Sequence, residues 1–464
     1  MNDVTKRGQH AVVLGASMAG LLAARVLADF YDSVTIVDRD VLPEEPVNRR
    51  GVPQGRHSHL LWGRGLRVLE ELFAGIGAEL IEAGVPACRG ELSQVYISTG
   101  GHPLPRSGHI ENFQLITPSR RFLEWHVRRR VAALANVEVL EGHDIVEPIT
   151  TATKDRITGA IVRTRPNGSE RALEADLVVD ATGRGARTPA FLDAMGYAPP
   201  TEDHLDVRLT YSSHLLQLPP EVPNEIAVIV GPVPGRPTGT FIFRNENNTA
   251  MFTVLGMAGH EAPSEFAQML SFIEEFTPAH VVAMIRDSVP LTDGNRHRMP
   301  TSRWRRYDRM RRFPHGLLVM GDAICSFNPI YGQGMTIAAL EALALQRCLR
   351  RDRGDLAQRF FQTTSKIISD AWQLATGADL TLPEVEGPRP LPVRITNKYV
   401  QQVQAAAEHD IVVAERLSNV AGLIDSPRRL MHPAVVARVA KVNFARRADK
   451  AAAAPAAIRA TADR

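Results

Sequence analysis

Residues 11–38 read AVVLGASMAGLLAARVLADFYDSVTIVD, and this stretch decides the fold. The apolar residues 11–14 predict a short buried strand, residues 15–20 a turn, and residues 18–29 a helix. Residues 34–37 then predict a second strand that ends at Asp38. Strand, turn, helix and strand together make a βαβ unit of about 30 residues, which is the start of a parallel sheet.

The turn of this unit is typical of a dinucleotide-binding site, although Ser17 replaces the middle glycine of the GxGxxG pattern. The first glycine permits the tight turn, and the last lets the helix pack closely on the strand. Backbone N–H groups at the helix start would face a pyrophosphate, and a carboxylate at residue 38 could accept both hydroxyls of a ribose. An ordinary strand–turn–helix would use similar small residues. We assign to the dinucleotide Gly15, Ser17, Met18, Gly20, Asp38 and Arg39.

A second block indicates which dinucleotide binds. Residues 316–342 read GLLVMGDAICSFNPIYGQGMTIAALEA, which predicts a strand at 317–320, a loop rich in Pro and Gly, and a helix from about residue 335. Asp322 could bond a ribityl hydroxyl, and N–H groups at residues 332–335 could hold the N1–C2=O edge of a flavin. NAD has no ribityl chain, so the block favours FAD over NAD, with an ordinary crossover loop as the alternative. We assign to the flavin Gly321, Asp322, Gly332, Gly334 and Met335.

These motifs, with three further stretches, carry a family resemblance. The further stretches are RRGVPQGRHSHLLWGRG at 49–65, TPSRRFLEWHVRRRV at 117–131 and ADLVVDATGRGARTP at 175–189. The chain resembles the flavin-dependent monooxygenases of the p-hydroxybenzoate hydroxylase and squalene epoxidase lineage, and is most similar to the actinobacterial branch that includes polyether epoxidases. The resemblance implies that Arg120, or failing it Arg121, contacts the flavin diphosphate, and it adds Gly183 and Arg56 to the cofactor site.

Two departures from the lineage affect the expected chemistry. The usual Asp-Gly motif, linked to flavin and NAD(P)H handling, appears as Thr182-Gly183, which puts direct use of a nicotinamide in doubt. No Trp-x-Trp-x-Ile-Pro segment occurs, which argues against the related flavin halogenases.

The loop at 49–65 holds the candidate catalytic residues. The lineage passes this segment beside the isoalloxazine ring, so Gln54, His57 and His59 are predicted to lie in the active site. Because no Cys, Asp or third His stands nearby at zinc-like spacing, we expect no metal. A solvated loop with ordinary hydrogen-bonded histidines remains the alternative.

The predicted fold class is α/β. A Rossmann-like FAD-binding domain at 1–200 and 301–350 carries an inserted, mainly antiparallel β-sheet substrate domain at 201–300, followed by a helical C-terminal region at 351–464. In the substrate domain Phe241, Phe243 and Phe252 could line a pocket or simply form core. Residues 264–285 look helical.

Composition excludes several other classes. Three cysteines and a net charge of +3 give no disulfide framework and no general attraction to nucleic acid. The six arginines in 303–312 suit a solvated ridge better than a nucleic-acid or anionic-partner site. We expect no transmembrane segment and a cytoplasmic protein, although residues 433–447 are weakly amphipathic and could touch a membrane surface.

The resemblance implies a monooxygenase that reduces FAD, forms a flavin hydroperoxide with O2 and transfers one oxygen atom to a small molecule. NAD(P)H would supply electrons, directly or through a partner reductase. Epoxidation of an alkene is favoured over hydroxylation of an aromatic ring, because no tyrosine pair with recognisable spacing suggests a proton relay. A flavin-dependent reductase of an isoprenoid-like alkene and a non-enzymatic FAD-binding protein are the alternatives.

Overall fold

The centre of the protein is a five-stranded parallel sheet in the order β19-β12-β1-β2-β8. We analysed a computed structural model of the chain, which describes residues 5–351 and 355–462, with side chains described up to residue 448. The five strands are β1 (Gly8–Leu14), β2 (Tyr31–Val37), β8 (Val137–Leu140), β12 (Leu177–Asp180) and β19 (Leu317–Val319). All four contacts between neighbouring strands are parallel, which confirms the sheet expected from the βαβ unit.

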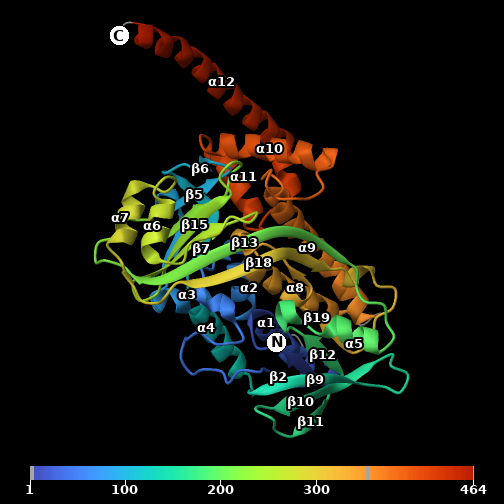
Figure 1. The fold of residues 1–464 in the computed structure, drawn as a ribbon. Coiled ribbons are helices and arrows are strands. Elements are labelled where there is room, and N and C mark those ends of the chain that lie inside the picture. The colour runs from blue at the N-terminus through green and yellow to red at the C-terminus, as the bar shows by residue number, and fades with distance from the viewer. Residues whose placement is uncertain (1–4, 352–354, 463–464) are drawn as a thin grey trace.

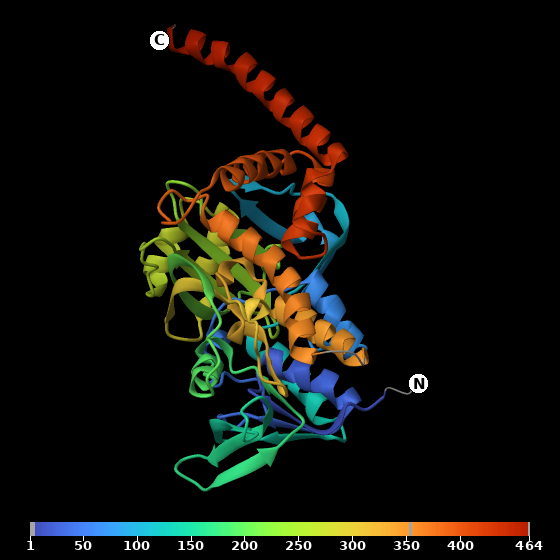
Figure 2. The same ribbon diagram turned by 90° about the vertical axis from the view of Figure 1, so that its right-hand side faces the viewer.

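Helices cover one face of this sheet and a small sheet covers the other (Figures 1 and 2). The helical layer holds α1 (Met18–Phe30) and α8 (Gly334–Arg350), with α9 (Leu356–Asp379) packed outside α8. Opposite them lie the antiparallel strands β9 (His143–Thr150), β10 (Ile157–Thr164) and β11 (Glu170–Glu174). Because both faces are covered, the strands need apolar residues throughout, and the last four residues of β1 are all buried.

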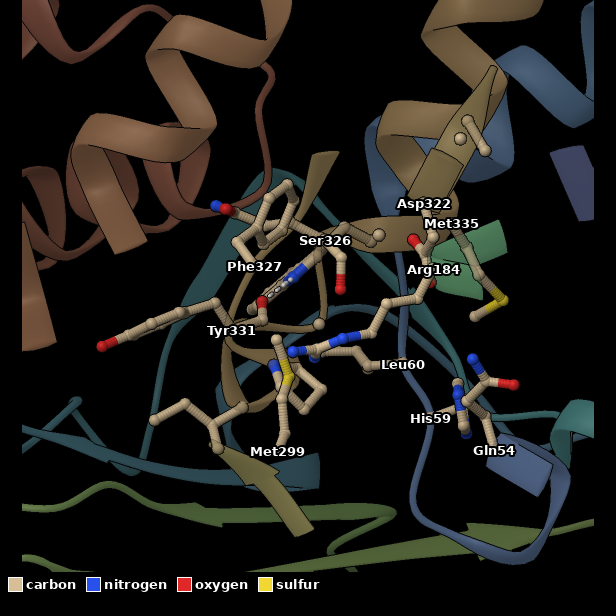
Figure 3. Close-up of a pocket in the computed structure, with 18 of the residues that line it drawn as sticks. Gln54, His59, Leu60, Arg184, Met299, Asp322, Ser326, Phe327, Tyr331 and Met335 are labelled. Carbon is tan, nitrogen blue, oxygen red and sulfur yellow. Dashed lines mark hydrogen bonds between the residues drawn. The ribbon is translucent and has the colours of Figure 1, made fainter. Parts of the chain in front are cut away.

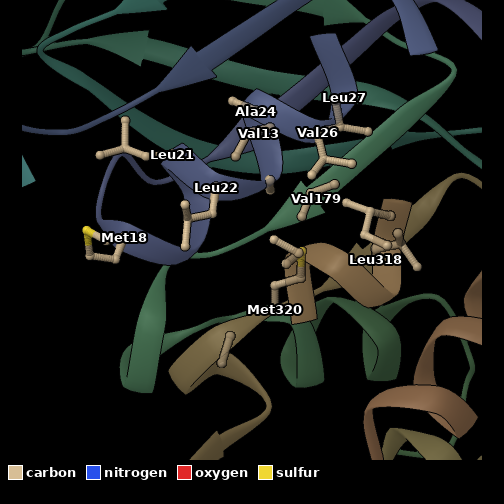
Figure 4. Packing of buried hydrophobic residues seen from close by; sticks show 14 of the residues in the cluster. Val13, Met18, Leu21, Leu22, Ala24, Val26, Leu27, Val179, Leu318 and Met320 are labelled. Carbon is tan, nitrogen blue, oxygen red and sulfur yellow. The ribbon is translucent and has the colours of Figure 1, made fainter. Parts of the chain in front are cut away.

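The core between α1 and the sheet positions the turn at residues 15–17. Figure 4 shows Leu22 and Val26 of α1 beside Val179 and Leu318 of the neighbouring strands. All four side chains are fully buried. Each buried aliphatic side chain contributes about 1.5–3 kcal/mol, so this packing fixes the helix relative to the strand ends.

A larger sheet of nine strands forms the second part of the molecule. Its order is β20-β18-β13-β16-β15-β14-β5-β6, with β17 paired to β13. The strands are β5 (Val95–Thr99), β6 (His102–Pro103), β13 (Glu202–Gln217), β14 (Ala227–Val230), β15 (Thr238–Asn245), β16 (Thr249–Gly256), β17 (Val289–Pro290), β18 (Asn295–Arg305) and β20 (Cys325–Ser326). Strands β5 and β6 come from before residue 200 and β18 passes residue 300, so this sheet is not confined to the expected insertion at 201–300.

Two helices cover the outer face of this sheet, in the segment 264–285 that was expected to be helical. These are α6 (Phe266–Ile273) and α7 (Ala279–Arg286). Pro278 stands at the N-cap of α7 and has no N–H to continue a helix, so the segment 264–285 breaks there. Phe252 is fully buried in the apolar cluster under these helices, while Phe241 and Phe243 belong to the cluster on the other face.

The remaining elements join the two sheets. A small sheet contains β3 (Leu61–Trp62), β7 (His109–Ile116) and β4 (Ala87–Glu91). The helices of this part are α2 (Gly63–Leu72), α3 (Ile76–Glu82), α4 (Arg120–Ala132) and α5 (Thr188–Ala194).

The C-terminal region is helical, as the sequence predicted, and its first helices pack on the inner side of the nine-stranded sheet. They are α9, α10 (Leu391–Ala407) and α11 (Ile411–Ala421), while α12 (Pro433–Ala462) extends away from the body (Figure 1). Val435 and Val439 of α12 are buried in the same cluster. The apolar face that could have contacted a membrane is therefore used inside the protein.

None of the helices in the described part of the chain is long and apolar enough to cross a membrane.

Candidate active site

A single large cavity of about 1270 Å³ joins the ends of the parallel strands to the nine-stranded sheet and the C-terminal helices. Its walls include the loops after β1, β2, β12 and β19, the strands β15 and β16, and residues of α9, α10 and α11. Figure 3 shows the part near Asp322, Arg184 and Tyr331. Because a ligand pocket usually measures about 300–1,000 Å³, this cavity has room for more than one ligand.

The turn after β1 requires both of its predicted glycines. Gly15 has φ +103°, and a Cβ there would stand 2.6 Å from the carbonyl oxygen of Ala181. At Gly20 a Cβ would stand 1.8 Å from the carbonyl oxygen of Gly15. Gly15, Ser17 and Met18 line the cavity, whereas Gly20 lies behind the turn and acts through packing.

Asp38 lies at the end of β2 beside this turn and lines the cavity with Arg39. Its carboxylate accepts hydrogen bonds from the Ala16 N–H at 2.7 Å, the Asp40 N–H at 2.9 Å and the Arg49 guanidinium at 3.1 Å. Because an ionised carboxylate has about four acceptor sites, Asp38 is held in place and keeps capacity for a further hydroxyl.

Arg120 lies next to the same turn, as the family resemblance implied. Its Nη2 donates to Ser17 Oγ at 2.9 Å and pairs with Glu124 at 2.7 Å. Glu124 also accepts from Arg49 Nε at 2.7 Å, so a buried carboxylate holds two buried guanidinium groups, and these groups keep its pKa below the ordinary value. Arg120 Nη1 is buried with no hydrogen-bond partner among the described residues. Arg121, the other candidate, does not line the cavity.

This arrangement fits the diphosphate of FAD. A buried guanidinium N–H without an acceptor destabilises the protein, and an anionic oxygen of the diphosphate would accept a hydrogen bond from it. The free N–H groups at the start of α1 and the positive end of its dipole lie at the same place.

The second motif also lines the cavity. Gly321 has φ +66°, and Asp322 follows it at the end of β19. Burial raises the pKa of Asp322, and the nearby Arg184 and Arg120 oppose that shift. Below the motif Glu341 of α8 is fully buried and accepts the Gly321 N–H at 2.6 Å. Burial raises the pKa of Glu341 to about 8, so this side chain is largely protonated at neutral pH.

The loop expected to hold the flavin edge is fixed by the C-terminal helices. Asp379, the last residue of α9, is fully buried and accepts from Asn328 Nδ2 at 2.9 Å and Tyr331 Oη at 2.7 Å. Gln333 donates to the Ala421 carbonyl of α11 at 3.1 Å. Gly332, Gly334 and Met335, which the sequence assigned to the flavin, line the cavity beside them.

His57 faces the cavity from the loop at 49–65 and begins a chain of hydroxyl groups. Its Nδ1 bonds Ser213 Oγ at 2.9 Å, which bonds Thr253 Oγ1 at 2.6 Å, which bonds Ser58 Oγ at 2.7 Å. Burial lowers the pKa of His57 to about 3, and the nearby His59, His297 and Arg56 add to this shift. The imidazole is therefore neutral at physiological pH.

Of the other residues predicted from this loop, His59 and Gln54 line the cavity and Arg56 does not. His59 lines the cavity, its Nδ1 lies 3.0 Å from the His57 carbonyl oxygen, and burial lowers its pKa to about 4. Gln54 also lines the cavity. Arg56, at the end of the short helical turn Pro53–Arg56, is exposed and is not among the residues that line the cavity, so this geometry does not support its predicted role at the cofactor.

Tyr211 and His297 of the large sheet complete this wall. The rings of His57 and Tyr211 meet edge to face with centroids 4.5 Å apart, and His297 lies 5.3 Å from Tyr211. Burial raises the pKa of Tyr211 and lowers that of His297, so both are neutral.

The Thr182-Gly183 pair lies after β12 and lines the cavity. Thr182 bonds the carboxylate of Asp180 through its N–H at 2.9 Å and its hydroxyl at 2.6 Å. Thr182 thus fixes the turn and supplies no charge to the site, while Gly183 adopts φ +78°.

The arginine run singled out in the sequence is used inside the protein. The arginine run at 303–312 is largely paired, since Arg306 contacts Asp203 and Asp308 at 2.7 Å each and Arg305 contacts Glu202 at 3.2 Å. In the described ranges no group of three or more His, Cys, Asp or Glu side chains could hold a metal ion.

Sequence reasoning missed several residues of the site. Arg49 was quoted only as part of a basic stretch, and Glu124, Tyr211, His297 and Asp379 were not singled out. A buried acid inside an arginine-rich helix, as at Glu124 in RRFLEWHVRRR, was a usable signal. The other three carry no local pattern and come together only through the fold.

Known proteins resemble this chain in sequence. No family model matches the sequence. The chain is 38% identical to Protein Rv3254 of Mycobacterium tuberculosis over 429 residues, 90% of each chain. It is 26% identical to kynurenine 3-monooxygenase of Salinispora tropica over 360 residues, 75% of this chain and 74% of that protein.

Solved structures share the fold at low sequence identity. The flavin-dependent brominase Bmp2 is 14% identical with a TM-score of 0.65, covering 96% of this chain and 100% of its own. PqsL of Pseudomonas aeruginosa, described as a probable FAD-dependent monooxygenase, is 18% identical with a TM-score of 0.59, covering 81% and 98%. The chain belongs to the same family as Protein Rv3254, within the superfamily of FAD-dependent monooxygenases.

Proposed function

We propose that this protein binds FAD and inserts one oxygen atom from O2 into a small organic molecule. The observation that carries the proposal is that one cavity joins a dinucleotide cradle to an apolar chamber. The cradle ends at Asp322 and the loop at 332–335, and the chamber begins there with Phe327, Met299 and Leu60 (Figure 3). The kynurenine 3-monooxygenase relatives support the same reaction type.

The protein's own residues bind, orient and exclude water. Arg120 and the N-terminus of α1 would neutralise the diphosphate, Asp38 would hold the adenosine ribose, and Asp322 the ribityl chain. The N-terminus of α8 would favour negative charge on the flavin edge. FAD, when bound, supplies the activation of O2 and the reactive oxygen atom, and NAD(P)H would supply electrons directly or through a partner reductase.

For the reaction itself we favour epoxidation of an alkene, as in the polyether epoxidase-like branch. Hydroxylation of a phenol is helped by a base whose pKa lies near the working pH. His57 and His59, with pKa values of about 3 and 4, are too weakly basic for that role, and Tyr211 stays a neutral phenol. An alkene needs no base, only an apolar surface that directs its π bond toward the flavin.

Aromatic hydroxylation is the second candidate. The chain of hydrogen bonds from His57 through Ser213 and Thr253 to Ser58 is the observation that favours it, because such a chain could move a proton. A flavin-dependent reductase of an alkene would use the same FAD site without O2.

Labelled oxygen separates these reactions. The purified protein should be yellow with non-covalent FAD, and the reduced enzyme mixed with 18O2 is offered polyene and phenolic compounds. One 18O atom in an epoxide, with activity retained in His57→Ala, supports epoxidation. Label only in phenolic products, with activity lost in His57→Ala, would establish hydroxylation, and a saturated product without label would establish a reductase.

FAD affinity tests the cofactor assignment separately. Asp322→Ala and Asp38→Ala should each weaken FAD binding about tenfold or more, because each removes a charge-assisted hydrogen bond worth ~1.5–3 kcal/mol. Asp193→Ala is the matched control, since Asp193 is exposed and does not line the cavity. FAD retained at wild-type affinity in the double variant would refute the assignment.

A further inference from the structure

The charges that line the cavity come from one part of the chain. Every Asp, Glu, Lys or Arg side chain lining the cavity comes from residues 38–187 or is Asp322, within the part of the chain that the structure describes. These are the residues of the FAD cradle and the loops next to it. The charged part of the cavity is therefore mostly the part that the cofactor would fill, and Arg184 reaches from it toward Met299 of the nine-stranded sheet (Figure 3).

The opposite half contains two walls. One is the inner face of the nine-stranded sheet, where Phe241 and Phe243 alternate on β15 and stack with centroids 6.3 Å apart. The other is formed by α9, α10, α11 and the short turn at Pro427–Met431. None of the described lining residues in these two walls is Asp, Glu, Lys or Arg.

The histidines of this half are neutral or already paired. Burial and the nearby Arg184 lower the pKa of His297. His102 Nδ1 lies 2.8 Å from Glu408. The remaining polar groups of the C-terminal wall are hydroxyls and neutral amides, such as Asn397 and Gln404 of α10.

The nearest cation of the cofactor half is also engaged. Arg184 Nη2 donates to the Thr301 carbonyl oxygen at 2.8 Å, and the Asp322 carboxylate is its main attractive charge. A substrate carboxylate or ammonium entering the uncharged half would lose hydration without gaining an ionic partner. The effective cost of burying such an ion is several kcal/mol.

We propose that the substrate is an uncharged, mainly apolar molecule that extends from the flavin along the Phe241–Phe243 face to the C-terminal helices. Hydroxyl or carbonyl groups at its far end are bound by neutral amides of α10. This inference rests on the proposed function for the position of the flavin. It sets this chain apart from its kynurenine 3-monooxygenase relatives, which are named for a zwitterionic amino acid.

Binding to the oxidised, FAD-loaded protein tests the inference without turnover. Calorimetric titration at pH 7.5 compares farnesol with farnesoic acid and farnesylamine, which share its chain but carry a negative or positive charge, and with kynurenine. We expect farnesol to bind at least about tenfold more tightly than either charged analogue, and kynurenine not to bind. Equal or tighter binding of a charged analogue, binding of kynurenine, or no binding of farnesol would overturn the inference.

A charge placed in the C-terminal wall should change this preference. Gln404 lines the cavity and Lys has a similar length, so Gln404→Lys should raise the affinity for farnesoic acid relative to farnesol. Gln362→Lys is the matched control, because Gln362 of α9 is exposed and does not line the cavity. If both variants kept the wild-type ratio of affinities, the C-terminal wall would not contact the ligand and the inference would be wrong.

The two proposals fail in different ways. Tight binding of farnesol with no oxygenated product under reducing conditions would leave the substrate class intact and count against the oxygenase reaction. Oxygenation of a charged compound, with no binding of farnesol, would do the reverse.

Discussion

Replacing Asp379 by asparagine should stabilise the protein above neutral pH and leave its stability nearly unchanged in acid. Asp379 is fully buried at the end of α9, and its Oδ1 accepts from Asn328 and Tyr331 at 2.9 and 2.7 Å. Its Oδ2 is buried with no partner among the described residues. Asparagine keeps the carbonyl acceptor for both donors and cannot ionise.

The size of the effect follows from the acid's pKa. Burial raises the pKa of Asp379 from 3.8 to about 7, partly offset by its two hydrogen bonds. Between these values the unfolded chain releases a proton that the folded protein keeps, so stability falls as pH rises and levels off above pH 7. A difference of about three in pKa corresponds to ~4 kcal/mol, which is the expected gain of Asp379→Asn above pH 7.

Asp379→Ala should destabilise the protein most clearly in acid, where the wild-type carboxyl is protonated and carries no cost of ionisation. Removal of the acceptor leaves the Asn328 amide and the Tyr331 hydroxyl buried without their carboxylate partner, at about 1–3 kcal/mol each. Because both residues belong to the loop at 328–335, we also expect weaker FAD binding. Asparagine should restore the loop and the FAD affinity, and alanine should not.

Thermal unfolding of wild type, Asp379→Asn and Asp379→Ala from pH 5 to 9 checks these expectations, with FAD affinity measured in parallel. Asp193→Asn, on the exposed surface, serves as the control. A stability difference between wild type and Asp379→Asn that stayed constant from pH 5 to 9 would refute the raised pKa. Wild-type FAD affinity in Asp379→Ala would refute the role of the loop.

Three further predictions concern the cofactor. Arg120→Met should weaken FAD binding by about tenfold or more in equilibrium dialysis, because it removes a buried N–H that could donate to a diphosphate oxygen. Arg121→Met should leave FAD binding unchanged, because Arg121 does not line the cavity. Gly20→Ala should lower the melting temperature and abolish FAD binding, because its Cβ would meet the Gly15 carbonyl at 1.8 Å; a yellow, equally stable variant would contradict this. Reduction of the bound flavin by NADPH or NADH should be slow in stopped-flow measurements, because Thr182 stands where the lineage's Asp-Gly motif has an acid. Rapid, saturable NADPH oxidation would contradict that expectation.

Local patterns were sufficient for three of the five strands of the parallel sheet. Residues 11–14, 34–37 and 317–320 are short apolar runs bounded by glycine or aspartate, and such runs are typical of strands buried on both faces. The turns at Gly15 and Gly321 were predictable because a positive φ there favours glycine. The large sheet was harder, because β5 and β6 join it from before residue 200, and pairing between distant segments leaves no local pattern.

The candidate site likewise contains residues that motifs predict and residues that leave no pattern in the sequence. The residues proposed to hold the adenosine ribose, the diphosphate and the ribityl chain stand at strand ends and helix starts, so Asp38, Arg120 and Asp322 could be found from motifs. The chamber wall formed by the C-terminal helices follows no such constraint, because recognition of an uncharged molecule needs only apolar side chains and a few amides, which also occur in any helix packed on a core. That region showed no chemistry in the sequence for this reason. The same lack of charge that left no pattern in the sequence is the property from which we infer a neutral substrate.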